Sequence, residues 1–343
     1  MTTSAAFRLA SAAGLALALA APAGAQTLTM SWWGFNGDRL EEFILAPFRA
    51  ECGCEIVIET GNNADRLNRV QIRGGAGVDL IYLTDSFSQT GIEAGLFQEI
   101  DRSQAPNIDG LYDLAQAPQG PYGPAYTIGR VGIVYDSAKV APITSWADLW
   151  RPDLAGMVAL PGITTTAGPM VVMIAGETAG VDAFEDQDAA FAQLEEMLPN
   201  VVKNYNTGSE MINLFSTGEI AVSIAQDFAL GQLQAAVPTI VWAELTDGDI
   251  ATLNTINIPV GAENPELAHR FLNFVLDPAR QQILAENGVD APTHTAVDLA
   301  PEVAARWTYG AEQLASLRRV DYARMNAARP EWIELWNELF GGR

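Results

Sequence analysis

Two long extended segments constrain the fold of this chain more than any other feature of its sequence. The first covers residues 125–135 and the second 250–259, about 120 residues further on, and both have the apolar character of strands. The residues between them contain strands and helices of their own. This arrangement predicts one α/β domain inserted into another through a pair of hinge strands, with a cleft between the two parts where ligands of such folds commonly bind.

The segments before the first hinge strand alternate between strand and helix. Their order is strand 27–33, helix 37–51, strand 55–59, helix 64–73, strand 78–83 and helix 87–95. The near-continuous apolar run at 78–83 is typical of a strand that is buried on both faces of a parallel sheet. Strands that alternate with helices predict an α/β fold with a largely parallel sheet.

The inserted block and the C-terminal part continue the alternation. Strand-like runs occur at 157–160 and 220–225, and helical spacing occurs at 183–197, 209–215, 264–276 and 278–287. Ser145 stands where it could cap a helical turn at 146–150. We therefore predict two lobes, each a mixed sheet flanked by helices, with the first made of 26–129 plus 258–300 and the second of 130–257 plus 301–343.

The N-terminal residues predict export. Arg8 precedes an apolar run at 9–21, and Ala23 and Ala25 have the A-x-A spacing of a signal cleavage site. The apolar run is too short for a membrane anchor, which would need about 20 residues. We predict a signal peptide at 1–25 and a soluble, exported mature protein.

The charge balance excludes one class of partner. The chain carries 19 Lys and Arg against 42 Asp and Glu, a formal net charge of -23. Nucleic-acid binding needs clustered positive charge, so we expect no nucleic-acid partner. An acidic surface keeps a secreted protein soluble, and it could also steer cations towards a cleft.

Reactive and metal-binding residues are few. His269 and His294 are distant in sequence from each other and from the Cys pair, so we expect no metal and no cofactor. Cys52 and Cys54 could form a disulfide in an oxidising compartment, although one intervening residue makes such a bridge uncommon.

Because no G-x-S-x-G motif occurs and neither His has catalytic neighbours, we expect a binding protein and not an enzyme. Acid counts alone leave a carboxylate-dependent hydrolase open.

Residues near strand ends could bind a cation. Trp32 or Trp33 could hold an ammonium group against its ring. The other Trp would pack in the core, because neighbouring strand residues point to opposite faces. Asp85 and Asp227 could pair with the same ammonium group, or each could cap a helix instead.

A second set of residues suits an anionic group. Thr164 and Thr165 follow the strand at 157–160, together with Thr166 and Gly168. Hydroxyls and backbone N–H groups at a helix start can bind an anion, or they can simply cap the helix. Arg130 in the first hinge strand could hold a carboxylate with two hydrogen bonds, or it could form a salt bridge within the hinge.

An ordered set of short motifs carries a family resemblance. The motifs are Ser31-Trp32-Trp33, Val78–Ile81 with Thr84-Asp85-Ser86, Thr144–Trp150, Pro199-Asn200-Val201, Ser216–Ile220, Ile256–Pro259 and Phe271–Phe274. With these motifs, nearly the whole predicted mature chain resembles the periplasmic polyamine-type (spermidine/putrescine) binding proteins of ABC transporters. The resemblance implies a two-lobed periplasmic-binding-protein fold of type II.

The resemblance also implies ligand positions. The aromatic of the family after the first strand falls on Trp32 or Trp33, and its hydroxyl positions fall on Thr84 and Ser86. The family's second-lobe acids fall in 162–166, which contains no acid. The family's Trp and Asp before the second hinge strand fall near Thr252 and Asn254. We therefore expect a small amine or a zwitterion in place of a long polyamine, and we add Tyr126 and Asn254 to the expected contacts.

The implied function is transport. The resemblance implies the periplasmic substrate-binding component of an ABC importer, which captures a small polyamine-like or zwitterionic amine in the interlobe cleft. It would act as a monomer and deliver its ligand to an inner-membrane ABC permease. A binding protein of the same fold for iron, a thiamine-like compound or a sugar is the alternative.

Overall fold

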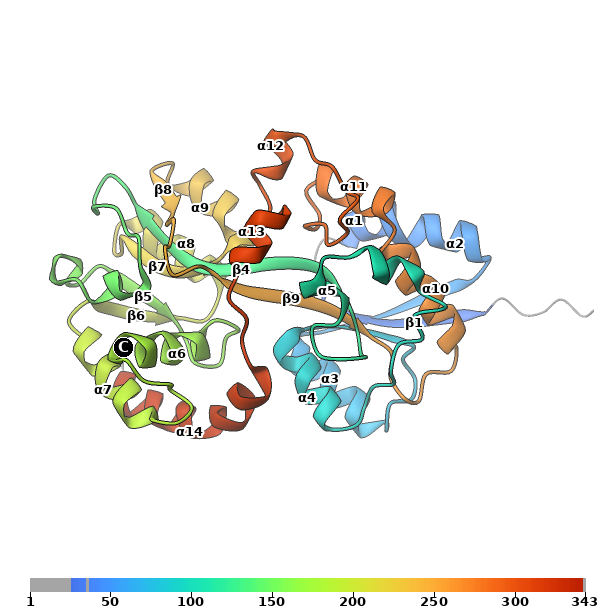
Figure 1. Cartoon of the computed structure of the whole chain (residues 1–343), viewed down its shortest axis with the longest axis horizontal. Helices are drawn as coiled ribbons and strands as arrows, with labels where there is room; N and C mark the ends of the chain where they lie inside the picture. The colour runs from blue at the N-terminus through green and yellow to red at the C-terminus, as the bar shows by residue number, and fades with distance from the viewer. Residues whose placement is uncertain (1–25, 35–36, 342–343) are drawn as a thin grey trace, which may run out of the picture.

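A computed structural model describes residues 26–34 and 37–341 of the chain. The predicted signal peptide at 1–25 lies outside the described residues. The described part contains nine strands in one mixed sheet, in the order β2-β1-β3-β9-β4-β7-β5-β6, with β8 paired to β4. Helices flank this sheet on both sides (Figure 1), which confirms the predicted α/β class.

The first half is built on three parallel strands that each lead into a helix. The strands are β1 (Thr27–Trp32), β2 (Glu55–Thr60) and β3 (Leu80–Thr84). The helices that follow them are α1 (Gly37–Leu40), η1 (Glu41–Leu45), α2 (Ala46–Cys52), α3 (Asn63–Ile72) and α4 (Asp85–Glu93). The half also contains η2 (Pro106–Gly110), α5 (Asp113–Gln116), α10 (Pro265–Val275) and α11 (Pro278–Glu286).

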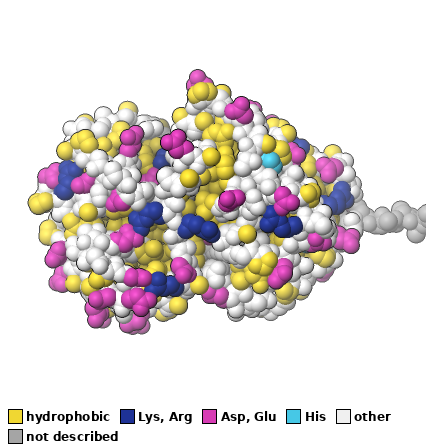
Figure 2. All heavy atoms as spheres, viewed as in Figure 1, with side chains coloured by type: hydrophobic (Ala, Val, Ile, Leu, Met, Phe, Trp, Pro, Cys, Tyr) yellow, Lys and Arg dark blue, Asp and Glu magenta, His cyan; other side chains and the backbone are white. Residues whose placement is uncertain are grey.

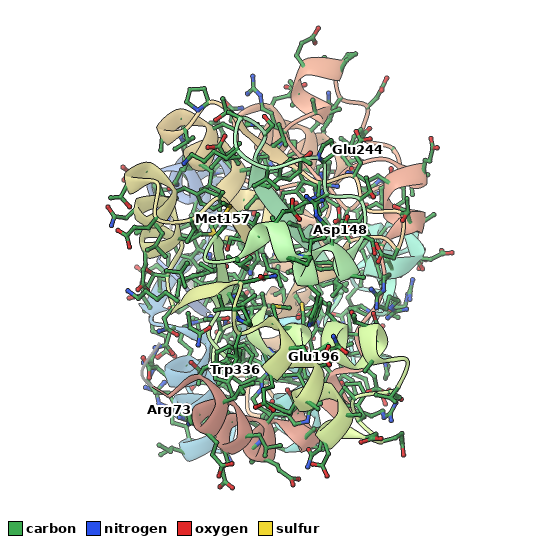
Figure 3. All side chains as sticks on the ribbon, turned by 90° about the vertical axis from the view of Figure 1, so that its left-hand side faces the viewer. Arg73, Asp148, Met157, Glu196, Glu244 and Trp336 are labelled. Atoms are coloured by element: carbon green, nitrogen blue, oxygen red, sulfur yellow. A yellow bond between two sulfur atoms is a disulfide. The ribbon has the colours of Figure 1, made fainter. Side chains whose placement is uncertain are left out.

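The second half repeats this plan. Its parallel strands are β5 (Val158–Pro161), β6 (Val201–Tyr205) and β7 (Val222–Gln226), and β8 (Ile240–Trp242) lies at the edge. Its helical segments are η3 (Trp146–Trp150), η4 (Pro152–Leu154), α6 (Gly168–Ala179), α7 (Gln187–Met197), α8 (Gly208–Thr217), η5 (Asp227–Ala229) and α9 (Leu230–Ala236). Figure 3 looks at this end of the molecule, with Met157 just before β5 and Trp336 of the C-terminal helix labelled.

Two strands join the halves. β4 (Ala125–Asp136) and β9 (Ile250–Asn257) run side by side through the middle of the molecule (Figure 1) and pair antiparallel along their shared length. β9 also pairs with β3, and β4 also pairs with β7. The two extended segments predicted from the sequence are thus confirmed as strands, and they merge the two expected sheets into one.

The buried apolar residues divide into two large cores. One groups side chains from 28–128 and 253–314, and the other groups side chains from 131–250 and 322–340. The division falls within β4 and β9, as hinge strands require. On the side of the molecule seen in Figure 2, hydrophobic side chains gather where the two halves meet. The lobe boundaries predicted along the backbone stay a prediction.

The C-terminal chain passes from one half to the other. α12 (Pro301–Ala304) and α13 (Ala311–Ser316) precede the long α14 (Tyr322–Phe340). α14 contacts α4 of the first half and α6 and α7 of the second. It therefore spans both halves on one side of the hinge.

Local chemistry explains several boundaries. Ser145 accepts a hydrogen bond from the N–H of Ala147, and Asp148 completes the capping box of η3, so the predicted cap is confirmed. The helix predicted at 37–51 is interrupted by the π-helical turn η1. Cys52 and Cys54 form a disulfide, and Gly53 between them ends α2 with a φ of 64°, a left-handed conformation that favours glycine.

Candidate ligand-binding site

One face of the hinge carries polar and aromatic side chains from neighbouring strands. β3 pairs with β9 so that Tyr82 lies opposite Ile256 and Thr84 lies opposite Asn254. Because side chains alternate along a strand, Tyr82, Thr84 and Asn254 point to the same side of the sheet, together with Thr252. We call this side the front face.

Three aromatic rings form a cluster on the front face. The ring centroids of Tyr82 and Tyr126 are 5.0 Å apart, and that of Trp33 lies 5.9 Å from Tyr82 and 6.5 Å from Tyr126. Tyr126 reaches this face because the register between β4 and β9 shifts at the start of β4. Trp33 is half-buried, whereas Trp32 is only 8% exposed and packs in the core. Trp33 is therefore the predicted Trp that joins this aromatic cluster (Trp33, Tyr82 and Tyr126).

A carboxylate without a protein partner exerts its charge on two rings of the aromatic cluster. Burial raises the pKa of Asp290 to about 7. Burial also raises the pKa values of Tyr82 and Tyr126, and the nearby charge of Asp290 adds to both shifts. Within the described residues, no group donates a hydrogen bond to the Asp290 carboxylate or forms an ion pair with it. A half-buried carboxylate without a protein partner favours a cation as its partner.

Sequence reasoning missed Asp290. It is one of 42 acidic residues, and it stands in the loop after α11, outside any periodic segment. Its importance comes from the effect of its charge on two tyrosines more than 150 residues earlier in the chain. No spacing in the sequence carries that information.

A buried cation lies against Trp33. The side chain of Arg66 is fully buried, and its guanidinium carbon is 4.9 Å from the Trp33 ring centroid. Burial lowers the pKa of Arg66 to about 10, so the group stays charged at neutral pH. Its hydrogen-bond acceptors are neutral oxygens: the carbonyls of Gly61, Ser31 and Tyr82 and the side-chain oxygen of Asn63.

Asn63 connects Trp33 with Thr84. Its Oδ1 accepts a hydrogen bond from Trp33 Nε1 at 3.1 Å and from the backbone N–H of Thr84 at 3.4 Å. Its Nδ2 lies 3.5 Å from the Thr84 hydroxyl. Thr84 in turn is paired with Asn254. The structure thus brings three predicted ligand residues, Trp33, Thr84 and Asn254, to one place.

Asp227 lies on the front face in the second half. Its Oδ1 is 2.8 Å from the position that a Cβ atom on Gly129 would take, and Gly129 pairs with Thr252. The hydroxyl of Thr308 donates a hydrogen bond to Asp227, and burial raises the pKa of this carboxyl. The next residue, Phe228, is 70% exposed. Phe228 thus offers an exposed aromatic ring beside a carboxylate, with which the second half can contact a ligand.

Asp85 and Ser86 lie on the opposite side of the hinge. Asp85 Oδ2 accepts a hydrogen bond from the backbone N–H of Leu253 at 2.9 Å, and burial raises the pKa of Asp85 to about 7. Ser86 accepts a hydrogen bond from Arg329 of α14 at 3.0 Å. Asp85 and Tyr322 of α14 line a small cavity of about 20 Å³. The structure therefore places both predicted residues against α14 and away from the aromatic cluster.

Arg130 is paired within the second half. Its Nη1 lies 2.7 Å from Asp249 Oδ2, and its guanidinium carbon lies 4.7 Å from the ring centroid of Trp242. Of the two roles that the sequence left open, this position matches the salt bridge.

The threonine loop after β5 caps a helix. Thr165 donates a hydrogen bond to the carbonyl of Gly162 at 2.8 Å and accepts one from the N–H of Gly168 at 3.1 Å. Thr164 is exposed to solvent. The capping role that the sequence left open for Thr165 is therefore present at the start of α6.

Other features of the described residues lie apart from the front face. An open pocket of about 450 Å³ in the first half is lined by Arg270, Arg280, Phe274 and neighbouring polar residues, and by none of the predicted ligand residues. Among residues 26–34 and 37–341, no group of three or more His, Cys, Asp or Glu could hold a metal ion. In the same residues, no helix has the length and apolar character needed to cross a membrane.

Comparison with known proteins identifies the family. The model for bacterial extracellular solute-binding proteins matches residues 44–311. The chain is 26% identical over 307 residues to the spermidine/putrescine-binding periplasmic protein of Escherichia coli, covering 86% of this chain and 87% of that protein. It is 25% identical over 299 residues to the gamma-aminobutyric acid-binding protein of Pseudomonas aeruginosa, covering 82% and 81%.

A solved structure supports the same assignment. The crystal structure of an ABC transporter protein from Clostridium perfringens matches with a TM-score of 0.86 and 38% identity, over 91% of this chain and 99% of that one. The family model covers most of the described residues, including both hinge strands and the aromatic cluster except Trp33. The chain therefore belongs to the bacterial extracellular solute-binding protein family.

Proposed function

We propose that this protein is the periplasmic substrate-binding component of an ABC importer and that it binds a small amine between its two halves. The observation that carries the proposal is the aromatic cluster of Trp33, Tyr82 and Tyr126, together with the partnerless carboxylate of Asp290, whose charge acts on both tyrosines. An ammonium group suits both features, since a carboxylate neutralises its charge and aromatic rings attract it. The names of two relatives state spermidine/putrescine and gamma-aminobutyric acid as ligands, and all of these are amines.

The amine would bind first to the first half. Its ammonium group would donate to Asp290 in front of Tyr82 and Tyr126, and the new ion pair would hold the carboxylate in its charged form. The carbon chain of the ligand would lie against the rings. From the second half, Asp227 and Phe228 would complete the enclosure.

Five of the residues predicted from the sequence keep a place in this site. These are Trp33, Thr84, Tyr126, Asn254 and Asp227, to which we add Asp290 and Phe228. The other predicted residues lie outside this site. Trp32, Asp85, Ser86, Arg130 and Thr165 have the bonds and packing described above, and Thr164 is exposed to solvent.

Binding would be coupled to closure of the halves. A few residues in β4 and β9 can absorb the change in backbone angles that hinge bending needs. The ligand would favour the closed form only to the extent that it binds that form more tightly. The closed, monomeric protein in the periplasm would then deliver the amine to its membrane permease.

Thermal melting of the mature chain with a ligand panel tests the proposal. The panel contains butylamine, 4-aminobutyrate, 1,4-diaminobutane, glucose, thiamine and ferric citrate, and NMR of each mixture detects any turnover. We expect a rise in melting temperature with at least one amine and no chemical change in it. Stabilisation by glucose, thiamine or iron alone would refute amine binding, and hydrolysis of any panel compound would refute a simple binding role.

A further inference from the structure

We propose that Arg66 limits the aromatic cluster to a single ammonium group, so that the preferred ligand is a zwitterion with an ammonium at one end and an anionic group at the other. This inference rests on the amine binding proposed above and names the class of amine. It concerns the Trp33 end of the cluster, where Arg66 lies, whereas the charge of Asp290 acts on the two tyrosines.

The charge of Arg66 has no counter-ion in the described part of the chain. Its four hydrogen bonds go to neutral oxygens. The carboxylate whose charge raises its pKa is Glu59, and Glu59 forms its ion pairs with Arg69 and Arg73. The positive charge of Arg66 is therefore felt by whatever lies next to Trp33.

The position of Arg66 decides what Trp33 can bind. Its guanidinium already lies 4.9 Å from the ring centroid, so one face of the ring is engaged with a cation. A ligand ammonium at the other face would have this buried charge behind the ring. At an effective dielectric of about 20, two like charges within about 10 Å repel enough to weaken a binding constant roughly tenfold.

The remaining polar groups at this end can donate hydrogen bonds. Asn63 Oδ1 already accepts from Trp33, Arg66 and Thr84. That oxygen is thus occupied. Asn63 Nδ2 donates to the Thr84 hydroxyl at 3.5 Å and keeps a second N–H, and the Thr84 hydroxyl can itself donate. The amide of Asn254 makes no side-chain hydrogen bond with another described residue and faces Thr84. Hydrogen-bond donors near a positive charge that has no counter-ion favour a carboxylate or a similar anion.

The cluster thus has opposite electrostatic preferences at its two ends. Asp290 attracts a cation beside Tyr82 and Tyr126, and Arg66 disfavours one beside Trp33. A short diamine would satisfy only the first end, whereas an ω-amino acid of the same length would satisfy both.

Calorimetry on the unmodified protein gives the first test. The probes are 4-aminobutyrate, butylamine and 1,4-diaminobutane, which share one ammonium group and a four-carbon chain. We expect 4-aminobutyrate to bind at least tenfold more tightly than 1,4-diaminobutane, with butylamine between them. If the diamine binds as tightly as the amino acid, the proposal for Arg66 is wrong while amine binding stands; if no amine binds, the proposed function itself fails.

Two Arg66 variants give the second test. Arg66→Gln removes the charge and should bring the affinity ratio of 4-aminobutyrate to 1,4-diaminobutane close to one. Arg66→Lys keeps the charge and should preserve the ratio even if both affinities fall. A purely structural Arg66 would instead weaken both ligands by the same factor in both variants, and that result would overturn the proposal.

A third variant covers the case in which Arg66→Gln does not fold, as judged by its melting curve. Thr84→Val removes a donor and leaves Arg66 in place. We expect it to weaken 4-aminobutyrate about tenfold more than it weakens 1,4-diaminobutane. Equal weakening of the two ligands would contradict an anionic group at this end.

Discussion

Arg130, in the middle of β4, and Asp249, just before β9, form an ion pair with 2.7 Å between Nη1 and Oδ2. The indole N–H of Trp242 donates to the same carboxylate oxygen at 3.0 Å, and its ring lies under the guanidinium. The side chains of Arg130 and Asp249 are 21% and 8% exposed. The positive charge that could have bound a ligand carboxylate is therefore neutralised inside the protein.

Removing Arg130 should therefore affect stability more than binding. Arg130→Met leaves a nearly buried carboxylate unpaired, and we expect the free energy of unfolding to fall by about 2–3 kcal/mol. Ligand affinity should change less than threefold. Urea unfolding and calorimetry with 4-aminobutyrate check both effects, and Arg130→Met with Asp249→Asn should recover part of the stability. A large loss of affinity at unchanged stability would show that Arg130 contacts the ligand.

Asp290 should carry the largest share of amine affinity. Asp290→Asn keeps the shape of the side chain and removes its charge. A desolvated ammonium left unpaired costs roughly 2–5 kcal/mol, so affinity for an amine should fall at least about thirtyfold. Asp298→Asn, at an exposed position further along the same segment, is the matched control. Binding as tight as that of the control would remove Asp290 from the site.

Asp227 should matter less than Asp290. Its carboxylate already accepts a hydrogen bond from Thr308, and backbone groups of Arg130 and Phe228 also bond to it. Because these partners remain in Asp227→Asn, we expect an affinity loss below about tenfold by calorimetry. A loss larger than that of Asp290→Asn would reverse the order of the two acids.

Stability should rise as the pH falls through the neutral range. Burial raises the pKa values of Asp85 and Asp290 to about 7, so the folded protein binds these protons more tightly than the unfolded chain. Between pH 4 and 7 the free energy of unfolding should therefore decrease with rising pH, by up to about 1.4 kcal/mol per pH unit for each group.

Asp85→Asn isolates one of these two contributions. Its free energy of unfolding should depend less steeply on pH than that of the parent, and Asp298→Asn should keep the parent slope. Urea unfolding at several pH values between 5 and 8 measures both slopes. Identical slopes for the parent and Asp85→Asn would contradict a raised pKa at this position.

The disulfide between Cys52 and Cys54 should contribute little to stability. It closes a loop with only Gly53 inside, and loop-closure entropy assigns such a bridge about 1.5 kcal/mol. The double variant Cys52→Ser and Cys54→Ser should unfold at slightly lower urea concentration with unchanged amine affinity. A loss above about 3 kcal/mol would mean that the bridge supports more than its own turn.

Much of the fold could be predicted because local periodicity determines it. The segments of β3 and β9 have the apolar character of buried strands, and Ser145 and Asp148 have the spacing of a capping box. The interruption of the first long helix by η1 leaves no mark in the spacing of its apolar residues. The merging of two sheets depends on pairing between β4 and β9, which are distant in sequence.

The candidate site could be predicted only where a residue follows a strand end. Trp33 and Thr84 were found in this way. Arg66 and Asp290 were not, because a buried Arg in a helix and an Asp in a loop look like ordinary surface residues until strands from elsewhere cover them. The sequence predicts Asp85 as a ligand residue because it follows a strand end. Its actual partners, the N–H of Leu253 and Tyr322 of α14, come from distant parts of the chain.

The contact between α14 and α4 has a practical consequence. Asn326 donates hydrogen bonds to the carbonyl of Ser86 at 2.9 Å and to the hydroxyl of Thr90 at 3.1 Å, so the halves are tied together behind the hinge. In a rotation, points near the axis hardly move and distant points travel furthest. Fluorescent labels at Asp38 and Thr164, which follow strand ends in opposite halves, would report opening of the protein, while labels on α4 and α14 would serve as a stationary reference. α14 thus offers a reference position for a fluorescent sensor of the ligand.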